Sequence, residues 1–313
     1  MENLGSRMAE IMEKHNWGEK AGEIYRQILQ DPDIRTFLNE HRDELDSEAV
    51  SRGMSKLIEY VDFRDRYRAG QKTMIPGYYP VLSVSSRQIQ IDYAPTSASL
   101  ERRRQSEIRH RVTAVNVPKS VRNASLQEYR PDTKGRAKAL QYALQFSNEY
   151  GENPGEFHRG MYLSGKFGVG KTYLLGALAN ELAEKGFSTT ILHVPTFIED
   201  LKSLFGRDTG QTVSDAVNRV KSAPVLMLDD IGADSLSNWS RDDILGVILQ
   251  YRMQEELPTF FSSNLSMADL ERDYLTSSNR MDADELKSGR IMERIRFLAD
   301  EFLIDGPNRR NYR

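Results

Sequence analysis

Gly165-Lys166-Phe167-Gly168-Val169-Gly170-Lys171-Thr172 is the stretch of this sequence that decides the fold. It matches the phosphate-binding pattern G-x-x-x-x-G-K-[ST] at each fixed position. A short apolar run, 160–164, precedes it and predicts a buried strand, and the apolar positions of 173–182 have helical spacing. Phosphate binding requires a strand, a glycine loop and a helix in this order. The sequence therefore predicts a nucleotide-binding loop rather than an ordinary glycine-rich turn.

The chemistry of phosphate binding gives the residues of this loop separate tasks. Glycines let the loop curl so that backbone N–H groups point at phosphate oxygens, and the N-terminus of the next helix adds its positive dipole end. Lys171 is expected to reach the β- and γ-phosphates of ATP, and the Thr172 hydroxyl to hold Mg²⁺. The expected nucleotide-binding residues are Gly165, Gly168, Val169, Gly170, Lys171, Thr172 and Tyr173.

An acidic pair, Asp229 and Asp230, directly follows the apolar run 225–228, which predicts a second buried strand. Ligands bind at the carboxyl ends of strands in open α/β sheets. Asp229 is expected to hold Mg²⁺ directly or through water, and Asp230 to orient and polarise the attacking water. Glutamate is usual at the second position, so the shorter Asp230 predicts slow hydrolysis. An acidic turn after a core strand is less favoured, because a phosphate-binding loop precedes the pair at a typical distance.

Two further polar residues end predicted strands. Asn264 ends the run 257–264 and is expected to sense the γ-phosphate or to hold the attacking water, a role compatible with capping the next helix. His193 lies in the run 189–194 and is interpreted as structural, because no second histidine or acid lies at metal-ligand spacing. Strands and helices alternate through this half of the chain, which predicts a parallel sheet with right-handed crossovers.

The first 95 residues predict a small, mainly helical domain that contains a β-hairpin. Apolar residues recur at three- and four-residue steps in three segments, 8–30, 34–38 and 47–61. Asp31 precedes Pro32, a pairing typical of a helix N-terminus. Two runs of β-like sequence with a short polar turn between them predict the hairpin, 79–84 and 89–93.

The segment 96–134 is expected to link this domain to the nucleotide-binding domain, 135–313. Its basic stretch, 100–104 and 109–111, is compatible with a contact to nucleic-acid phosphates and equally with a solvated linker helix. The expected fold class is therefore α/β: a phosphate-loop domain with a parallel sheet, preceded by a small helical domain with a hairpin.

Composition limits the classes of function. The chain has 313 residues, a formal net charge of −3 and no cysteine. The charge excludes a basic nucleic-acid coat, and the lack of cysteine excludes disulfides and thiolate zinc sites. The N-terminus lacks the apolar segment of a signal peptide, and no apolar run approaches membrane-spanning length. We therefore expect a soluble, cytoplasmic protein that does not bind membranes.

Four motifs in the second half of the chain resemble those of the bacterial replicative-helicase loaders of the DnaI/DnaC type, which are AAA+ ATPases. The motifs are LDDIG at 228–232, FFSSN at 260–264, RIMER at 290–294 and NRR at 308–310. The resemblance covers 160–313 strongly and the N-terminal helices more loosely. It implies an AAA+ domain that self-associates, and an N-terminal domain, 1–95, that grips the hexameric replicative helicase.

The same resemblance implies roles for three arginines. Arg294 is implied to be the arginine finger that enters a neighbouring subunit's site, and Arg309 or Arg310 to be the second sensor of the bound nucleotide. The family's cysteine-rich zinc site has no counterpart here, so zinc is not expected as a cofactor. Apolar residues are expected to hold the hairpin instead, namely Ile75, Tyr78, Val81, Val84, Ile89 and Ile91.

The expected function is an ATP-dependent loader that places the replicative helicase on single-stranded DNA during initiation or restart of replication. Two alternatives remain open. A transposition helper ATPase of the IstB type shares the phosphate loop and the acidic pair, although the long helical N-terminal domain disfavours it. A nucleotide-gated adaptor that hydrolyses little ATP would need the same binding site.

Overall fold

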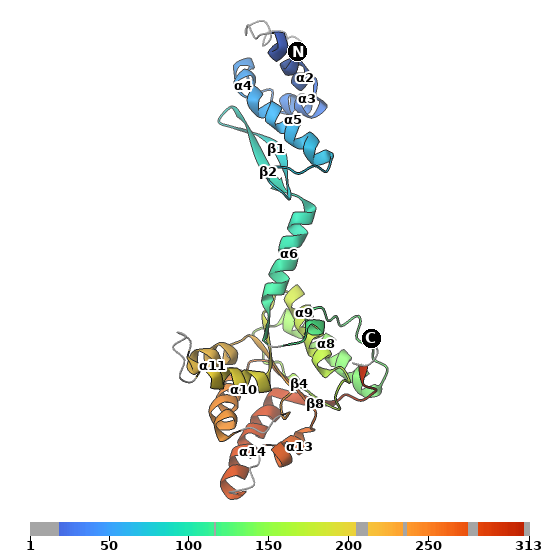
Figure 1. Ribbon diagram of the computed structural model, residues 1–313, viewed down its shortest axis with the longest axis vertical. Coiled ribbons are helices and arrows are strands. Elements are labelled where there is room, and N and C mark those ends of the chain that lie inside the picture. Colours follow the sequence, from blue (N-terminus) through green and yellow to red (C-terminus); the bar gives the residue numbers. More distant parts are fainter. Residues whose placement is uncertain (1–18, 116, 205–211, 234–236, 275–280, 310–313) are drawn as a thin grey trace. The chain divides into compact units, whose positions relative to one another are not determined.

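A computed structural model describes residues 19–115, 117–204, 212–233, 237–274 and 281–309. The chain forms two compact units, 1–105 and 106–313, whose elements are shown in Figure 1. The sequence placed boundaries at 95 and 135, whereas the division between the units falls inside one helix, Ser97–Arg111. The difference arises because a strand within the expected linker, Val112–Val115, belongs to the sheet of the second unit.

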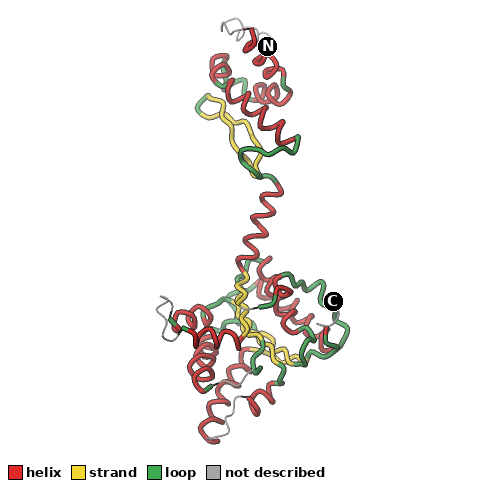
Figure 2. The backbone as a smooth tube through the Cα atoms, in the orientation of Figure 1, coloured by secondary structure: helices red, strands yellow, loops and turns green. Residues whose placement is uncertain are grey.

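The first unit consists of helices packed on an antiparallel hairpin, as the sequence predicts (Figure 2). Its elements are α2 (Glu19–Gln30), α3 (Pro32–Glu40), α4 (Ser47–Arg52), α5 (Met54–Arg68), β1 (Tyr78–Ser85), β2 (Gln88–Pro95) and α6 (Ser97–Arg111). The Asp31 side chain caps α3 by accepting hydrogen bonds from the backbone N–H groups of Asp33 and Ile34, at 3.0 and 3.3 Å. Part of the helical segment expected from residue 8 lies outside the described residues.

Apolar side chains hold the hairpin against the helices. Ile89 is buried in the core of this unit, and Leu82 and Val84 pack against that core. The Phe63 and Tyr93 rings add a contact at 5.2 Å between centroids. The expectation of an apolar contact is thus confirmed for Ile89 and Val84. It is wrong for Ile75 and Val81, which are exposed, because Val81 lies on the hairpin face that alternates away from the helices.

A buried ion pair joins α5 to the start of α3. Arg64 donates to both carboxylate oxygens of Asp31, at 2.6 and 2.7 Å, and to Asp33 Oδ2 at 3.0 Å. Hydrogen bonding to Arg64 lowers the pKa of Asp31 below its usual value. Because the pKa is lowered on folding, the stabilisation is present above the unfolded-state pKa of about 3.9 and is lost as pH falls through the folded-state value.

Replacing Arg64 with alanine is expected to lower the free energy of unfolding by about 3 kcal/mol at pH 7, because Asp31 loses its cation in a mostly buried place while Asp33 keeps Arg68. Arg66→Ala is the matched control, since Arg66 forms an exposed pair with Asp62 at 3.0 Å. It is expected to cost less than about 0.5 kcal/mol. Urea denaturation followed by circular dichroism measures both. Equal losses in the two variants would show that the Arg64 contacts do not stabilise the unit.

The second unit is built on a six-stranded sheet with the order β3-β5-β6-β7-β4-β8, and all five strand pairs are parallel. Its strands are β3 (Val112–Val115), β4 (Gly160–Ser164), β5 (Thr189–His193), β6 (Val225–Asp229), β7 (Thr259–Ser263) and β8 (Ala299–Leu303). The helices are α7 (Lys119–Arg122), α8 (Lys134–Glu152), α9 (Lys171–Glu184), α10 (Val194–Ser203), α11 (Val213–Lys221), α12 (Gly246–Gln254), α13 (Met267–Asp269) and α14 (Met281–Leu298), with π-helical stretches η1 (Trp239–Leu245) and η2 (Leu270–Tyr274). The predicted parallel sheet is confirmed.

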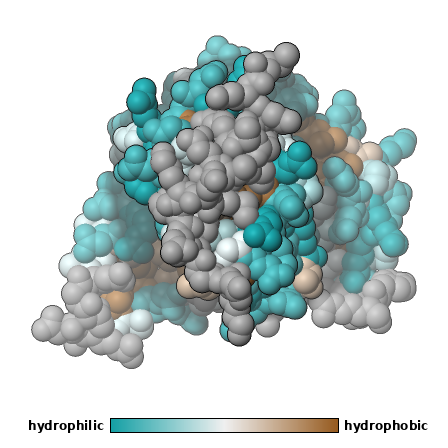
Figure 3. Space-filling view, turned by 90° about the horizontal axis from the view of Figure 1, so that it is seen from above, coloured by the Kyte–Doolittle hydropathy of each residue, from teal (hydrophilic) through white to brown (hydrophobic). Residues whose placement is uncertain are grey.

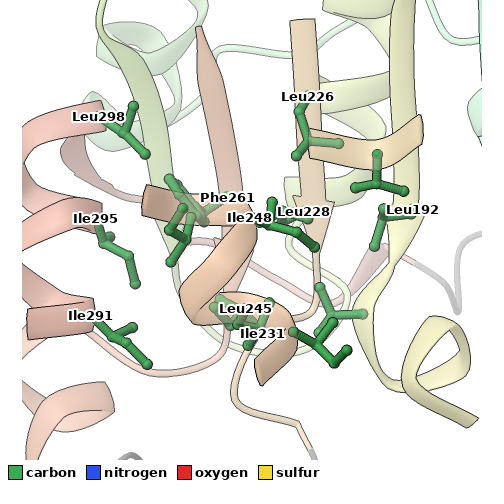
Figure 4. Packing of buried hydrophobic residues seen from close by; sticks show 14 of the residues in the cluster. Leu192, Leu226, Leu228, Ile231, Leu245, Ile248, Phe261, Ile291, Ile295 and Leu298 are labelled. Carbon is green, nitrogen blue, oxygen red and sulfur yellow. The ribbon is translucent and has the colours of Figure 1, made fainter. Parts of the chain in front are cut away.

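Both faces of this sheet are covered, so the strands read as continuous apolar runs. On one face, Leu228 and Phe261 lie against Ile248 of α12 and Ile295 of α14, as Figure 4 shows. On the other face, side chains of α8 and α9 pack on Met161, Met227 and Phe260. Sites that need polar groups are thereby confined to the ends of the strands. The described surface visible in Figure 3 is mostly hydrophilic, with apolar atoms in scattered areas.

Candidate nucleotide-binding site

The loop 165–170 connects β4 to α9 and is shaped by glycines with positive φ. Gly168 has φ 77° and Gly170 has φ 99°, a region that side chains rarely adopt. A Cβ atom on Gly168 would also lie 2.0 Å from the Asn308 side-chain oxygen, so only glycine fits there. The loop borders a cavity of about 770 Å³ whose lining residues are Pro118, Val121, Phe167, Gly168, Gly170, Lys171, Thr172, Tyr173, His193, Thr196, Asp229, Asp230, Ser262, Asn264 and Arg309.

Lys171 begins α9 and is nearly buried. Its ammonium group donates to the backbone carbonyls of Gly165 and Lys166, at 2.7 and 3.0 Å, and to Asn264 Oδ1 at 2.8 Å. All three of these acceptors are neutral. These three partners therefore do not neutralise the positive charge of Lys171, and a positive charge at the phosphate loop suits an anionic ligand.

Asp229 ends β6 and is buried. Its Oδ1 accepts hydrogen bonds from the hydroxyls of Thr172, at 2.8 Å, and Ser262, at 2.5 Å. Burial raises the pKa of Asp229 above its usual value. A carboxylate and two hydroxyls offer the hard oxygen ligands that Mg²⁺ prefers, and such a cation would offset the burial of the charge, so the residues fit this ion. Ser262 was not identified from the sequence.

Asp230 follows the strand with φ 62° and is held from both neighbouring strands. Its backbone N–H donates to Ser262 Oγ at 3.0 Å, and Asn264 Nδ2 donates to its Oδ1 at 3.0 Å. On the other side, His193 Nε2 lies 3.6 Å from Oδ2 of Asp230, and the other ring nitrogen of His193 is 2.8 Å from the Thr196 hydroxyl. The His193 ring thus lines the cavity beside Asp230, a position that the sequence did not indicate, and its interpretation as structural rather than metal-ligating stays a prediction.

A second cavity, of about 870 Å³, shares Gly170, Tyr173 and Arg309 with the first. The rings of Tyr129 and Tyr173 stack here with centroids 6.3 Å apart, and the Arg136 guanidinium lies 4.3 Å from the Tyr129 centroid. The Tyr129 hydroxyl and the Arg309 Nε atom are buried and have no hydrogen-bond partner within the described residues. Buried polar atoms are usually hydrogen-bonded, so these two are available to a polar partner in the cavity, whether water or a bound ligand.

Arg309 is tied to the phosphate loop. Its backbone N–H donates to the Gly168 carbonyl at 2.9 Å, and its guanidinium binds Asp132. Arg136, which sequence reasoning did not identify, donates to the carbonyls of Arg130 and Val169 and so joins the segment before α8 to the same loop. Arg310, the alternative second sensor, lies outside the described residues.

Arg294 lies on α14, apart from the residues that line the two cavities. Its Nη1 donates to the Gly246 carbonyl at 2.9 Å, and burial lowers its pKa. The finger role of Arg294 stays a prediction.

The structure thus brings most of the expected residues to one cavity. Those that line it are Gly168, Gly170, Lys171, Thr172, Tyr173, Asp229, Asp230, Asn264 and Arg309. Gly165 contributes a carbonyl to Lys171, and Val169 is buried beneath the loop. Apart from Arg309, which lies in the segment after β8, each polar group reaches the cavity from the end of a parallel strand or from the start of α9. A sheet of this order with a phosphate loop after β4 and an acidic pair after β6 defines an AAA+ ATP-binding domain.

Comparison with known proteins agrees with this class. Residues 102–284 match the family described as IstB-like ATP binding protein, and residues 1–93 match the primosomal protein DnaI N-terminus. The replicative helicase loader DnaI of Bacillus subtilis (strain 168) is 34% identical over 316 residues, covering 99% of this chain and 100% of that protein. The chain belongs to the DnaI family of replicative helicase loaders.

Solved structures resemble about two thirds of this chain. A crystal structure of DnaI is 42% identical and covers 65% of this chain and 99% of its own, with a TM-score of 0.56. A putative primosome component from Streptococcus pyogenes serotype M3 is 43% identical over 66% of this chain and 98% of its own, with a TM-score of 0.54. Within the described residues, no helix is long and apolar enough to cross a membrane.

Proposed function

We propose that this chain is an ATP-controlled loader that binds the replicative DNA helicase and places it on single-stranded DNA during initiation or restart of replication. The observation that carries the proposal is the match to a named helicase loader along the whole chain, both units included. An IstB-type transposition helper is less well supported, because the match to that family model begins only at residue 102 and the preceding residues match the DnaI N-terminus.

In the proposed site, the phosphates of ATP lie against the loop 165–170 and the start of α9. Lys171 exchanges neutral oxygen partners for phosphate oxygens, which are stronger acceptors. Thr172 and Asp229 hold Mg²⁺, which neutralises phosphate charge. The nucleoside lies in the second cavity, where the Tyr129 and Tyr173 rings and the unpaired Tyr129 hydroxyl meet it.

Hydrolysis is proposed to depend on Asp230 and Asn264. The amide of Asn264 links Lys171 to Asp230, at 2.8 and 3.0 Å, so one side chain contacts both the phosphate-binding cation and the carboxylate that positions water. Such a link lets the protein respond to the presence of a γ-phosphate. Because aspartate is shorter than the usual glutamate, the proposed turnover is slow. We further propose that turnover rises when chains self-associate through the AAA+ domain.

A nucleotide-gated adaptor that hydrolyses little ATP is the second candidate, and the short reach of Asp230 favours it. The two candidates share the ATP site and differ in whether hydrolysis is needed for loading. Under both, the first unit binds the helicase and the second responds to ATP.

The expected division into 1–95, 96–134 and 135–313 is revised in this proposal to the observed units, 1–105 and 106–313. Because the helicase works on chromosomal DNA, the proposal places the chain in the cytoplasm.

The experiment that tests the proposed function is helicase loading on closed circular single-stranded DNA. With Mg-ATP present, the chain is expected to leave the hexameric helicase on circles that the helicase does not enter alone. Failure of the full chain to bind the helicase by size-exclusion chromatography, in any nucleotide state, would refute the proposal.

A further inference from the structure

The first unit exposes apolar side chains in one short stretch of sequence. Of the twelve large apolar side chains that are exposed in the described residues, five lie between 67 and 81. They are Tyr67, Met74, Ile75, Tyr79 and Val81, and are called here the exposed apolar cluster. Met74 is 92% exposed, the largest fraction among the twelve. Contiguous exposed apolar surface typically marks a site of interaction.

Backbone and ring contacts hold this cluster in place. The N–H of Gln71 donates to the Arg66 carbonyl at 2.9 Å and closes the end of α5, and the N–H of Tyr78 donates to the Ile75 carbonyl at 3.3 Å. The Tyr67 and Tyr79 rings lie 6.2 Å apart, which joins the end of α5 to the outer face of β1. These contacts fix the backbone on both sides of Met74 and the two tyrosine rings, and such preorganisation favours binding.

Basic residues outnumber acidic ones in the sequence around the cluster, although Arg66 and Arg68 are paired within the unit and Arg87 lies at the far end of the hairpin. The sequence between Asp65 and Asp92 contains no acidic residue and four basic ones, Arg66, Arg68, Lys72 and Arg87. The chain as a whole has a formal net charge of −3, so this excess is local. Arg103 of α6 adds a further positive group, since it binds the Tyr78 hydroxyl and lies 5.7 Å from the centroid of that ring. Lys72 and Arg103 thus favour a partner surface that offers acidic groups beside an apolar hollow.

We propose that the exposed apolar cluster is the surface by which this chain docks onto the replicative helicase. The inference rests on the proposed loading function and locates the contact within it. Tyrosine, methionine and arginine are the residue types enriched in protein–protein interfaces. The cluster also lies within residues 1–93, which match the DnaI N-terminus.

A protein partner fits these residues better than single-stranded DNA. Bases stack on aromatic rings, which Tyr67 and Tyr79 provide, but the other three residues of the cluster are aliphatic and offer no ring face. Two of the nearby cations are already paired, because Arg66 binds Asp62 and Arg68 binds Asp33, each at 3.0 Å. Fewer charges thus remain for phosphates than the sequence alone indicates.

The test uses the full chain and the replicative helicase of the same organism, with affinity measured by biolayer interferometry. Met74→Asp is expected to raise the helicase Kd about 30-fold or more, as loss of a central apolar contact does at interfaces. Tyr79→Thr, which keeps a strand-favouring residue, is expected to weaken binding similarly. Met74→Lys loses the apolar contact but adds a positive charge, the sign that an acidic partner surface favours, so its effect is expected to be smaller than that of Met74→Asp.

The matched control is Ile24→Asp, because Ile24 is also an exposed apolar residue of this unit, at 50%, and lies outside the cluster. It is expected to change the Kd by less than about threefold, as for a residue outside the interface. All four variants should keep the wild-type ATP affinity and melting temperature, which shows that they are folded.

The outcomes separate the surface from the function. If the wild type binds helicase and the Met74 and Tyr79 variants bind equally well, the proposed surface is wrong and the loading function stands. If the wild type does not bind helicase, the loading function fails and the surface fails with it. If these variants keep helicase binding but lose retention of a fluorescent oligonucleotide, the cluster is a nucleic-acid site and the inference is overturned.

Discussion

Lys171→Ala is expected to abolish tight ATP binding. Within the loop 165–172, Lys171 is the cation that lines the cavity, whereas Lys166 contributes a backbone carbonyl to the Lys171 ammonium group and is not among the lining residues. Loss of a hydrogen-bonded charge at a mostly buried site costs about 2–5 kcal/mol of binding free energy, or roughly 30- to 5,000-fold in Kd. Isothermal titration calorimetry with Mg-ATP measures the change.

Lys166→Ala is the matched control for this prediction, and it is expected to bind ATP within about threefold of the wild type, since its side chain is outside the cavity. Thermal melting of both variants separates a loss of ligand binding from a loss of fold, because Lys171 also bonds to Asn264 and to two backbone carbonyls. An unchanged ATP affinity in a folded Lys171→Ala protein would contradict the assignment of the site.

Arg294→Ala is expected to leave ATP affinity nearly intact and to remove the rise in specific activity with protein concentration. The chain's own cavity can bind phosphates through Lys171, but Arg294 does not line it, so any action on the γ-phosphate must come from a neighbouring subunit. An arginine supplied in this way raises turnover by roughly 10³–10⁵ in related enzymes. Phosphate release as a function of protein concentration measures the effect.

A mixing experiment makes this prediction decisive. Arg294→Ala and Lys171→Ala proteins lack different halves of a shared site, so mixed assemblies contain interfaces with an intact Lys171 and an intact Arg294. Recovery of ATPase activity on mixing supports action between subunits. Arg290→Ala is the control, because Arg290 is exposed one helical turn before Arg294 on α14.

The Arg294 variants also need a test of structure, because Arg294 donates to the Gly246 carbonyl. Loss of that bond is expected to lower the free energy of unfolding by about 1 kcal/mol. If Arg294→Ala hydrolyses ATP like the wild type at concentrations where the wild type assembles, Arg294 is not the finger and Arg290 becomes the next candidate.

Local patterns predicted the phosphate loop and the acidic pair, because the chemistry there depends on residues adjacent in the sequence. The glycines, Lys171 and Thr172 lie within one loop and one helix turn, and Asp229 and Asp230 directly follow an apolar run. The same holds for the hairpin, whose two β-like runs flank a short turn. For such features, spacing alone fixes which side chains meet.

The remaining site residues could not be predicted, because their contacts depend on the order of strands in the sheet. His193 reaches Asp230 only because β5 lies beside β6, and Ser262 reaches Asp229 only because β7 lies on the other side. In the sequence, a histidine ending a strand and a serine in an apolar run carry no such signal. The short strand β3 was missed for a related reason, since its residues pair with β5 far along the chain.

Retention of the helicase on closed circular single-stranded DNA tests the loading function most directly. The wild-type chain with Mg-ATP is expected to transfer the hexameric helicase to the circles, so that helicase and DNA elute together. The Lys171→Ala chain is expected to bind the helicase through its first unit but not to transfer the helicase to the DNA circles. The account of an ATP-controlled loader would be contradicted if the same amount of helicase were retained on the circles without the chain, or with the Lys171→Ala chain in place of the wild type.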